Sequence, residues 1–346
     1  MNWKYLARRI GIALSTIFFV LMLTYLLFEL SPLKPIDYLL NQLGLVPTQS
    51  GGLAAMRGSL LGSTLSQQQY EQIIAYLETF LPHGNPVINV LKYIYNILRG
   101  NWGVSLIYIE PVTVLIGSAL PWTLFVVATA NILNFFVGVY LGQLMAYNRG
   151  KKADQVLTQF ITVKRAIPIY IYAAVFLMVF GFYLHVVPTA GAYGVNVKPG
   201  LNLPFLLSVL RHAAMPIFTL FFATFGGWAL AMRGNVISQL GEDYVTYAEA
   251  RGLPSRYIRS RYVGRNALLP LYTSLIISIG FSFAGSVFVE QTFSYPGVGS
   301  LYVNALTNSD WMVAMGVLFI IVTAIAVGMI VADLTYSLID PRVRVG

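Results

Sequence analysis

The chain of 346 residues contains no cysteine, which excludes disulfides, thiolate metal sites and cysteine nucleophiles. Its three histidines, His83, His185 and His212, lie far apart, and none belongs to an HExxH pattern. No G-x-x-x-x-G-K-[ST] stretch occurs either, so the chain lacks the usual phosphate-binding loop of ATPases. We therefore expect no catalytic residue, no metal site and no cofactor bound by this chain itself.

Charged residues are also scarce, at 10% of positions, whereas hydrophobic residues make up 57%. Soluble domains carry about 25% charged residues, so the lipid bilayer is the main solvent of this chain. The net charge of +9 would suggest nucleic acid in a soluble protein. Here the placement of basic residues between apolar segments favours a role in membrane topology, and we expect no nucleic-acid partner.

Several apolar runs are long enough to cross about 30 Å of hydrocarbon at about 1.5 Å per residue. They cover residues 10–30, 120–147, 167–187, 213–232, 268–289 and 311–338. The sequence therefore predicts an all-α integral membrane protein with about six transmembrane helices. Loops rich in lysine and arginine are retained in the cytoplasm. If the N-terminus is cytoplasmic, most of the 22 lysine and arginine residues lie on the cytoplasmic side of the membrane. Both termini are expected in the cytoplasm.

Three parts of the chain follow from this pattern. Residues 1–30 would form the cytoplasmic N-terminus and the first helix, and residues 113–346 a core with five helices. Residues 31–112 would lie outside the cytoplasm as an unusually long helical insertion, with helix-like stretches at 67–80 and 87–98. Its mixture of apolar residues and sparse charge suits a small cap on the membrane surface.

The most informative segment is the predicted cytoplasmic loop 233–270. Glu242 and Asp243 open a helix, where acidic residues complement the positive end of the helix dipole. Gly252 is expected to end this helix in the left-handed conformation, and Leu253 with Pro254 begins a second helix.

The first of these helices carries a ridge of residues that recur every four positions, Tyr244, Ala248 and Gly252. A flat ridge of this kind suits insertion into a groove of another protein. Arg256, together with later arginines, gives the second helix a basic flank. From physics alone, a pair of amphipathic helices resting on anionic lipid fits as well as a docking site.

Motifs in this loop resemble the EAA loop of permeases in bacterial and archaeal ABC importers of the peptide/nickel class. They are Glu242-Asp243-Tyr244-Val245, Ala248, Ala250, Arg251-Gly252-Leu253 and Arg265-Asn266-Ala267-Leu268-Leu269-Pro270. Further motifs occur in the same order, including Arg8-Arg9, Ser31-Pro32, Val289-Glu290, Tyr295-Pro296-Gly297 and Asp340-Pro341-Arg342, and they fit the dipeptide/oligopeptide permease of the B type. The chain departs from general permeases at Thr246 and Arg251, where those have Glu and Asp, and in its long 31–111 segment.

The resemblance implies a permease subunit in the plasma or inner membrane of a bacterium or archaeon. A second homologous permease would complete the pathway, two cytoplasmic ATPases would supply energy from ATP and Mg²⁺, and an extracytoplasmic binding protein would deliver the substrate. The helix 241–251 would be the lever. The implied coupling residues are Glu242, Asp243, Tyr244, Ala248, Ala250, Gly252, Leu253 and Arg256. Nothing in the sequence chooses between peptides and oligosaccharides as substrate.

The candidate translocation pathway is a series on the fifth run with an unbroken spacing of four, formed by Ser274, Ser278, Ser282, Ser286 and Glu290. A weakly polar stripe suits passage of a hydrated, uncharged or zwitterionic solute. Close helix packing is an equally suitable role for such small residues. The outer loop with Tyr295, Pro296 and Gly297 fits either a tight turn or a segment that reaches into the outer mouth.

A similar pattern on the second run favours packing: Asn131 and Asn134 share a face with Gly138 and Gly142.

Two other classes of protein compete with the permease. An ion-coupled secondary transporter needs ionisable groups near the midplane, and these runs have almost none away from their ends. A membrane-embedded enzyme needs a buried nucleophile and base or a metal site, and no G-x-S-x-G motif or histidine cluster occurs.

Overall fold

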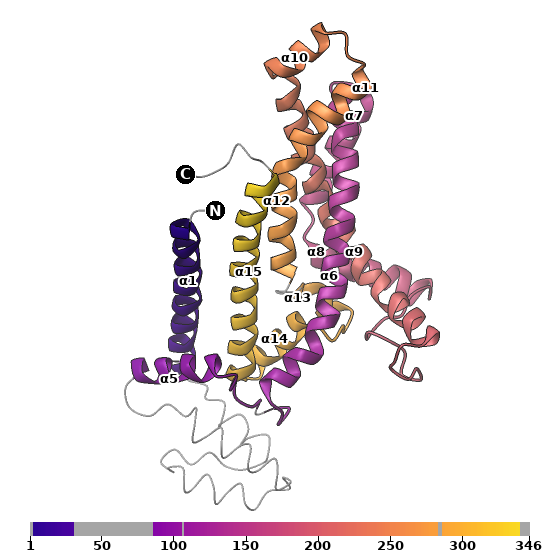
Figure 1. Cartoon of the computed structure of the whole chain (residues 1–346). Coiled ribbons are helices and arrows are strands. Elements are labelled where there is room, and N and C mark those ends of the chain that lie inside the picture. The colour runs from indigo at the N-terminus through magenta and orange to yellow at the C-terminus, as the bar shows by residue number, and fades with distance from the viewer. Residues whose placement is uncertain (1–2, 31–85, 106, 283–285, 340–346) are drawn as a thin grey trace, which may run out of the picture. The chain divides into compact units, whose positions relative to one another are not determined.

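A computed structural model describes residues 3–30, 86–105, 107–282 and 286–339 of the chain. These residues form helices joined by irregular segments, and their only bridge of β type pairs Val104 with Pro111 (Figure 1). The prediction of an all-α membrane protein is therefore confirmed. The helix-like stretch 67–80 and the motif Asp340-Pro341-Arg342 lie outside the described residues.

Four of the described helices are long and apolar enough to cross a membrane. They are α1 (Trp3–Glu29), α6 (Val112–Tyr147), α9 (Leu203–Leu240) and α15 (Trp311–Ile339). Each coincides with one of the predicted apolar runs. Many of their large apolar side chains are exposed on the protein surface, Leu14, Phe136 and Tyr140 among them, as expected where lipid is the solvent.

The third predicted run, 167–187, is helical over residues 169–183, and a separate helix precedes it at a sharp bend. α7 (Lys152–Arg165) meets α8 (Ile169–Phe176), which continues as the π-helix η1 (Leu177–Tyr183), and the two parts are bent by 92°. Pro168 stands at the bend, and proline disfavours helical backbone in the residue before it. The described helices thus give four spans, or five if this pair counts as one, against the six expected.

The fifth run was expected to be a single helix, and this prediction is wrong. α12 (Arg265–Phe281) is capped by Ser282, and a separate short helix, α13 (Val287–Thr292), follows. Glycine and serine are weak helix formers, so the same small residues that suggested a stripe also weaken the helix where it ends. α14 (Val298–Thr307) then leads to α15.

The residues fall into two compact units, and α6 and α15 each contribute to both. One unit comprises Met1–Pro121 and Gly297–Ala326. In it α5 (Pro86–Leu98), which confirms the predicted helix 87–98, packs against α1. Its core gathers Leu21, Tyr93, Val112, Ile116 and Met315, all less than 4% exposed.

A buried carboxyl group joins two segments of this unit. The Ser105 hydroxyl donates a hydrogen bond of 2.5 Å to the Asp310 carboxylate, and the backbone N–H of Val313 donates to the same side chain at 3.4 Å. Asp310 immediately precedes α15 and satisfies a free N–H of its first turn. Burial raises the pKa of Asp310 to about 6, although the hydrogen bond from Ser105 acts in the opposite direction.

The other unit comprises Trp122–Pro296 and Val327–Gly346. Its helices α6 and α9 cross very closely, because a Cβ atom at Gly138 would lie 2.3 Å from the Trp228 Cβ, and one at Gly142 would lie 2.4 Å from the Ala229 carbonyl oxygen. The side-chain amide of Asn134 adds a hydrogen bond of 2.7 Å to Thr224 of α9. These contacts support the packing interpretation of the small and amide residues on the second run.

Candidate functional site

The loop 233–270 folds as predicted at its first helix. α9 ends at Leu240, and α10 (Asp243–Ala250) begins after Glu242, which occupies the N-cap position with extended backbone. Asp243 lies in the first turn, where its negative charge complements the helix dipole.

The end of α10 is also confirmed. Gly252 adopts φ +72°, the left-handed conformation expected for it, and a Cβ atom there would meet no atom within 4 Å. The N–H of Leu253 bonds to the Ala248 carbonyl at 3.3 Å, a return contact typical of glycine-terminated helices. Backbone conformation, and not steric crowding, is therefore what requires glycine at position 252.

The second helix of the loop begins after Pro254, as expected, but its geometry is unusual. A single turn, α11 (Ser255–Tyr257), continues as the π-helix η2 (Ile258–Gly264), which leads into α12. A Cβ atom at Gly264 would lie 2.8 Å from the Arg259 carbonyl oxygen. Short π-helical segments are rare and are often found at functional sites. The arginines of this helix, Arg256, Arg259, Arg261 and Arg265, are exposed.

The predicted ridge of Tyr244, Ala248 and Gly252 does not form one exposed surface, because Tyr244 is half-buried and Ala248 is buried, whereas Gly252 is exposed. Ala248 is only 2% exposed and packs in a cluster with Val236 of α9, Val263 of η2 and Leu271 of α12. The physical reason is that small and apolar residues on a surface helix face its own core more readily than a partner.

Tyr244 extends this inward contact with hydrogen bonds. Its hydroxyl donates to the Gln239 side-chain oxygen at 2.5 Å and accepts from the Asn266 amide at 3.1 Å. Nearby, the Asn235 amide donates to the Ala267 carbonyl at 3.0 Å. α10 is therefore held firmly to α9 and to the start of α12.

The exposed side of α10 carries a different set of residues. Asp243, Thr246, Tyr247 and Ala250 follow the spacing of one helical face, and all four are exposed. Tyr247 is the most prominent, because 68% of its surface is open. Two of the predicted coupling residues, Asp243 and Ala250, lie on this face. Three others are exposed beside it, namely Glu242, Gly252 and Arg256, and Leu253 is half-buried. The four residues Asp243, Thr246, Tyr247 and Ala250 are called the α10 face.

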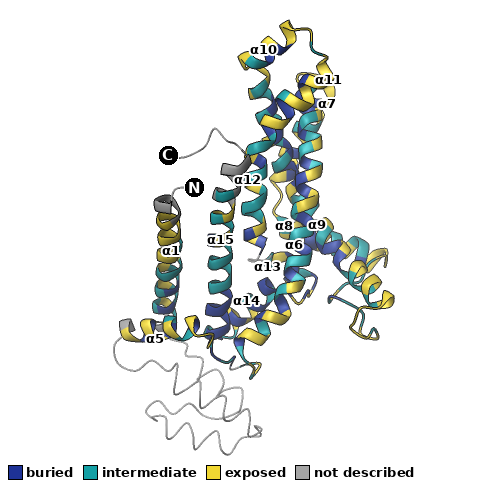
Figure 2. Cartoon of the chain, viewed as in Figure 1, coloured by how far each residue is buried: buried dark blue, intermediate teal, exposed yellow. Residues whose placement is uncertain are grey.

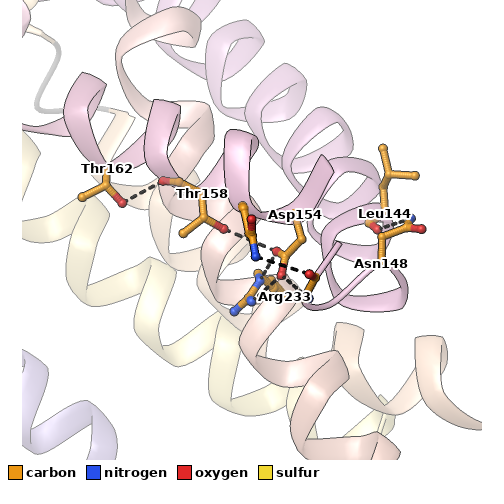
Figure 3. Close-up of polar contacts among 8 residues, drawn as sticks. Leu144, Asn148, Asp154, Thr158, Thr162 and Arg233 are labelled. Atoms are coloured by element: carbon orange, nitrogen blue, oxygen red, sulfur yellow. Dashed lines mark hydrogen bonds and ion pairs between the residues drawn. The ribbon is translucent and has the colours of Figure 1, made fainter. Parts of the chain in front are cut away.

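An ion pair that the sequence interpretation missed lies at the base of the loop. The Arg233 guanidinium of α9 donates two hydrogen bonds, of 2.6 and 2.8 Å, to the Asp154 carboxylate of α7 (Figure 3). The Gly150 N–H and the Thr158 hydroxyl also donate to Asp154, at 3.2 and 3.4 Å. The available signal in the sequence was Asp154 itself, because it lies close to two lysines in a chain with only 13 acidic residues.

The predicted polar stripe does not lie on one helix, because α12 ends before Ser282 and α13 begins after Ser286. Ser274 is exposed, Ser278 and Ser286 are half-buried, and Ser282 is fully buried. The Ser282 hydroxyl accepts a hydrogen bond of 3.0 Å from Asn131 of α6, and the same amide donates to the Ser278 carbonyl at 3.2 Å. Ser282 is thus a helix-packing residue, whereas Ser274 is open to the surface.

Glu290 ends the series as a buried group rather than as an exposed carboxylate. It is 2% exposed and accepts a hydrogen bond of 2.9 Å from Thr123 of α6. Tyr295 is buried beside it, and burial, with the charge of Glu290, raises the pKa of the Tyr295 phenol. Trp122 packs edge-on against Tyr295. In the outer loop Pro296 is exposed and Gly297 caps α14.

Comparisons with known proteins agree with the loop motifs. Residues 138–345 match the family described as binding-protein-dependent transport system inner membrane component. The oligopeptide transport system permease protein AppB of Bacillus subtilis is 29% identical over 82% of this chain and 88% of its own length. The dipeptide transport system permease protein DppB of Lactococcus lactis and the oligopeptide transport system permease protein OppB of Haemophilus influenzae are each 26% identical over 99% of both chains.

The chain belongs to the family of binding-protein-dependent transport system inner membrane components. It is a transmembrane permease subunit of an ABC importer, a transport subunit rather than an enzyme, and a multi-pass membrane protein. Importers of this family combine permeases, ATPases and a substrate-binding protein.

Proposed function

We propose that this chain is a permease subunit that carries peptides across the plasma or inner membrane of a bacterium or archaeon. It pairs with a second homologous permease, two ATPases that use ATP and Mg²⁺, and an extracytoplasmic binding protein. The names of the relatives support peptides over oligosaccharides, because the B. subtilis, L. lactis and H. influenzae proteins are all described as oligopeptide or dipeptide transport permeases.

We place both termini and the 233–270 loop in the cytoplasm and the 31–112 segment outside, on the distribution of basic residues. A chain without cysteine allows a direct topology test. A cysteine at Ser59 should react with a membrane-impermeant maleimide from the outside, and one at Tyr247 only after the inner face is exposed. The reverse labelling pattern would overturn the orientation.

The observation that carries the proposal is the way α10 is built into the membrane helices. Its inner side shares one hydrophobic cluster with α6, α9, η2 and α12, and its outer side leaves the α10 face open. A force applied to the α10 face is therefore delivered to α6, α9 and α12 at once. ATP-driven closure of the ATPase pair would move two such loops together and switch the helices between two packings.

The contacts of α12 suggest that some of its polar residues line the pathway and that others hold the helices together. Ser274 and Ser278, on the accessible part of α12, are the residues that we assign to the pathway lining. Ser282 and Glu290 hold α12 and α13 against α6 through Asn131 and Thr123. The backbone N–H of Tyr295 in the outer loop donates a hydrogen bond of 2.8 Å to the Glu290 carbonyl.

The function is tested by reconstituting the chain with its sister permease, ATPases and binding protein in liposomes. ATP-dependent uptake of a labelled oligopeptide, competed by unlabelled peptide and not by an oligosaccharide, is the expected result. Uptake of an oligosaccharide alone would overturn the substrate class and leave the permease assignment standing. Transport that needs an ion gradient and no ATPase would overturn the coupling mechanism.

A further inference from the structure

Helix α5 carries an apolar face that no described part of the chain covers. Its inner side, with Val90, Tyr93 and Ile97, is buried in the core that it shares with α1. The opposite side exposes Ile88, Leu91, Tyr95 and Leu98, which are between 51% and 75% open. The spacing of three and four residues places them on one face of the helix. Figure 2 shows the exposed outer side of α5.

The position of α5 along α1 sets its depth in the membrane. The apolar part of α1 extends from Ala7 to Phe28, and its 22 residues match a hydrocarbon layer of about 30 Å. α5 contacts this helix through Tyr93, whose ring lies 5.4 Å from the ring of Tyr25. Tyr25 precedes the end of the span by about one helical turn, or about 5 Å.

α5 crosses the end of α1 and does not run alongside it (Figure 1). An amphipathic helix that lies in the plane of a membrane sinks its apolar face about 5–10 Å below the headgroups. The depth estimated from Tyr25 falls in this range, whereas a helix that stood clear of the membrane would contact α1 beyond Phe28. A lipid surface is therefore the occupant that the position of α5 indicates.

The charges on the exposed side agree with this position. Lys92 and Arg99 lie along one edge of the exposed side, and Leu91 and Leu98 lie along the other. The Arg99 guanidinium stacks 4.3 Å from the centre of the Tyr95 ring. Tyrosine and long basic side chains are characteristic of the membrane interface, where the rings lie at headgroup level and the charges extend to water.

We propose that α5 is an interfacial anchor that lies in the leaflet where α1 ends. Leu91 and Leu98 face the acyl chains, and Lys92 and Arg99 face phosphate headgroups. In the orientation proposed above, this is the extracytoplasmic leaflet. This anchor does not depend on which substrate the permease carries.

The test uses single-cysteine variants of the full chain, Leu91→Cys, Leu98→Cys and Lys92→Cys, each carrying a nitroxide spin label. The protein, in the assembly in which it purifies, is reconstituted in liposomes of phosphatidylcholine and phosphatidylglycerol. Collisions with oxygen, which concentrates in lipid, are compared with collisions with a water-soluble nickel chelate. Retained transport activity identifies variants that are correctly folded. All three positions are exposed, so the substitutions should not disturb the fold.

We expect oxygen to dominate at Leu91 and Leu98, with a ratio of oxygen to nickel collisions several-fold higher than at Lys92. Three results would overturn the proposal. Dominance of nickel at Leu91 and Leu98 would show a face in water. Protection from both reagents would show a face covered by protein, such as the sister permease or the binding protein. Equal ratios at all three positions would show that the helix is not held in this rotation.

Discussion

Arg233 and Asp154 join α9 to α7 through two hydrogen bonds of 2.6 and 2.8 Å, at the start of the loop that we assign to ATPase coupling. The Asp154 side chain is 4% exposed and that of Arg233 26% exposed. A paired geometry of this kind is stronger and more directional than a surface ion pair. It gives α9 a fixed support at the point where force from α10 arrives.

Removing either partner should destabilise the subunit by more than removing both. Asp154→Asn leaves the Arg233 guanidinium without its charge partner, and Arg233→Gln leaves a buried carboxylate. A double-mutant cycle measured by thermal unfolding in detergent should give a coupling energy of about 1–3 kcal/mol. Additive effects of the two substitutions would show that the pair contributes no energy of its own.

The close crossing of α6 and α9 predicts a strong difference between two glycines. Gly142→Ala places a Cβ atom 2.4 Å from the Ala229 carbonyl oxygen, so the helices must separate, and we expect poor assembly and a lower thermal midpoint. Gly227→Ala is the matched control, since a Cβ atom at Gly227 meets nothing within 4 Å. It should be tolerated or slightly stabilising. Equal behaviour of the two variants would disprove the crossing.

Two serines of the candidate stripe should respond differently to a bulky substitution. Ser282→Leu inserts a large side chain into a fully buried site and removes the hydrogen bond from Asn131, so loss of the assembled complex is expected. Ser274→Leu, at an exposed position, should preserve assembly and basal ATP hydrolysis while it lowers peptide uptake. Normal uptake by an assembled Ser274→Leu complex would remove Ser274 from the pathway.

Asp310 should make stability depend on pH between about 4 and 6. Because burial raises its pKa to about 6 in the folded state, the folded protein binds this proton more tightly than the unfolded chain. Its stabilising contribution is complete below the unfolded pKa and is lost as pH rises through about 6. The thermal midpoint of the wild type should therefore fall relative to Asp310→Asn over this interval, and parallel pH profiles would contradict the assignment.

Much of the fold followed from apolar runs and turn residues. The four long helices are the strongest signals, because about 20 consecutive apolar residues have few other structural solutions. Gly252 was predictable for a similar reason, since few residues adopt positive φ at the end of a helix. The end of α12 at Phe281 was harder to predict, because an apolar run looks the same whether it forms one helix or two.

The sequence predicted a ridge with Tyr244 and Ala248 as the docking surface, whereas the surface that we propose lies on the opposite side of α10. Spacing alone shows that Tyr244 and Ala248 share a face, and it cannot show whether that face meets this chain or a partner. The decision depends on α12 and η2, which supply the residues that cover Ala248. The pairing of Asp154 with Arg233 depends in the same way on contacts between residues far apart in the sequence.

The α10 face is the central claim, and the affinity of the purified permease pair for its ATPases tests it most directly. Tyr247→Ala should weaken that affinity about tenfold, because truncating a prominent tyrosine at an interface costs about 1–2 kcal/mol. Tyr257→Ala is the control, since Tyr257 is also exposed but lies outside the α10 face. It should retain ATPases at the wild-type level. Wild-type ATPase affinity in Tyr247→Ala would contradict the account, because the exposed side of α10 would then not be the surface on which ATPases dock.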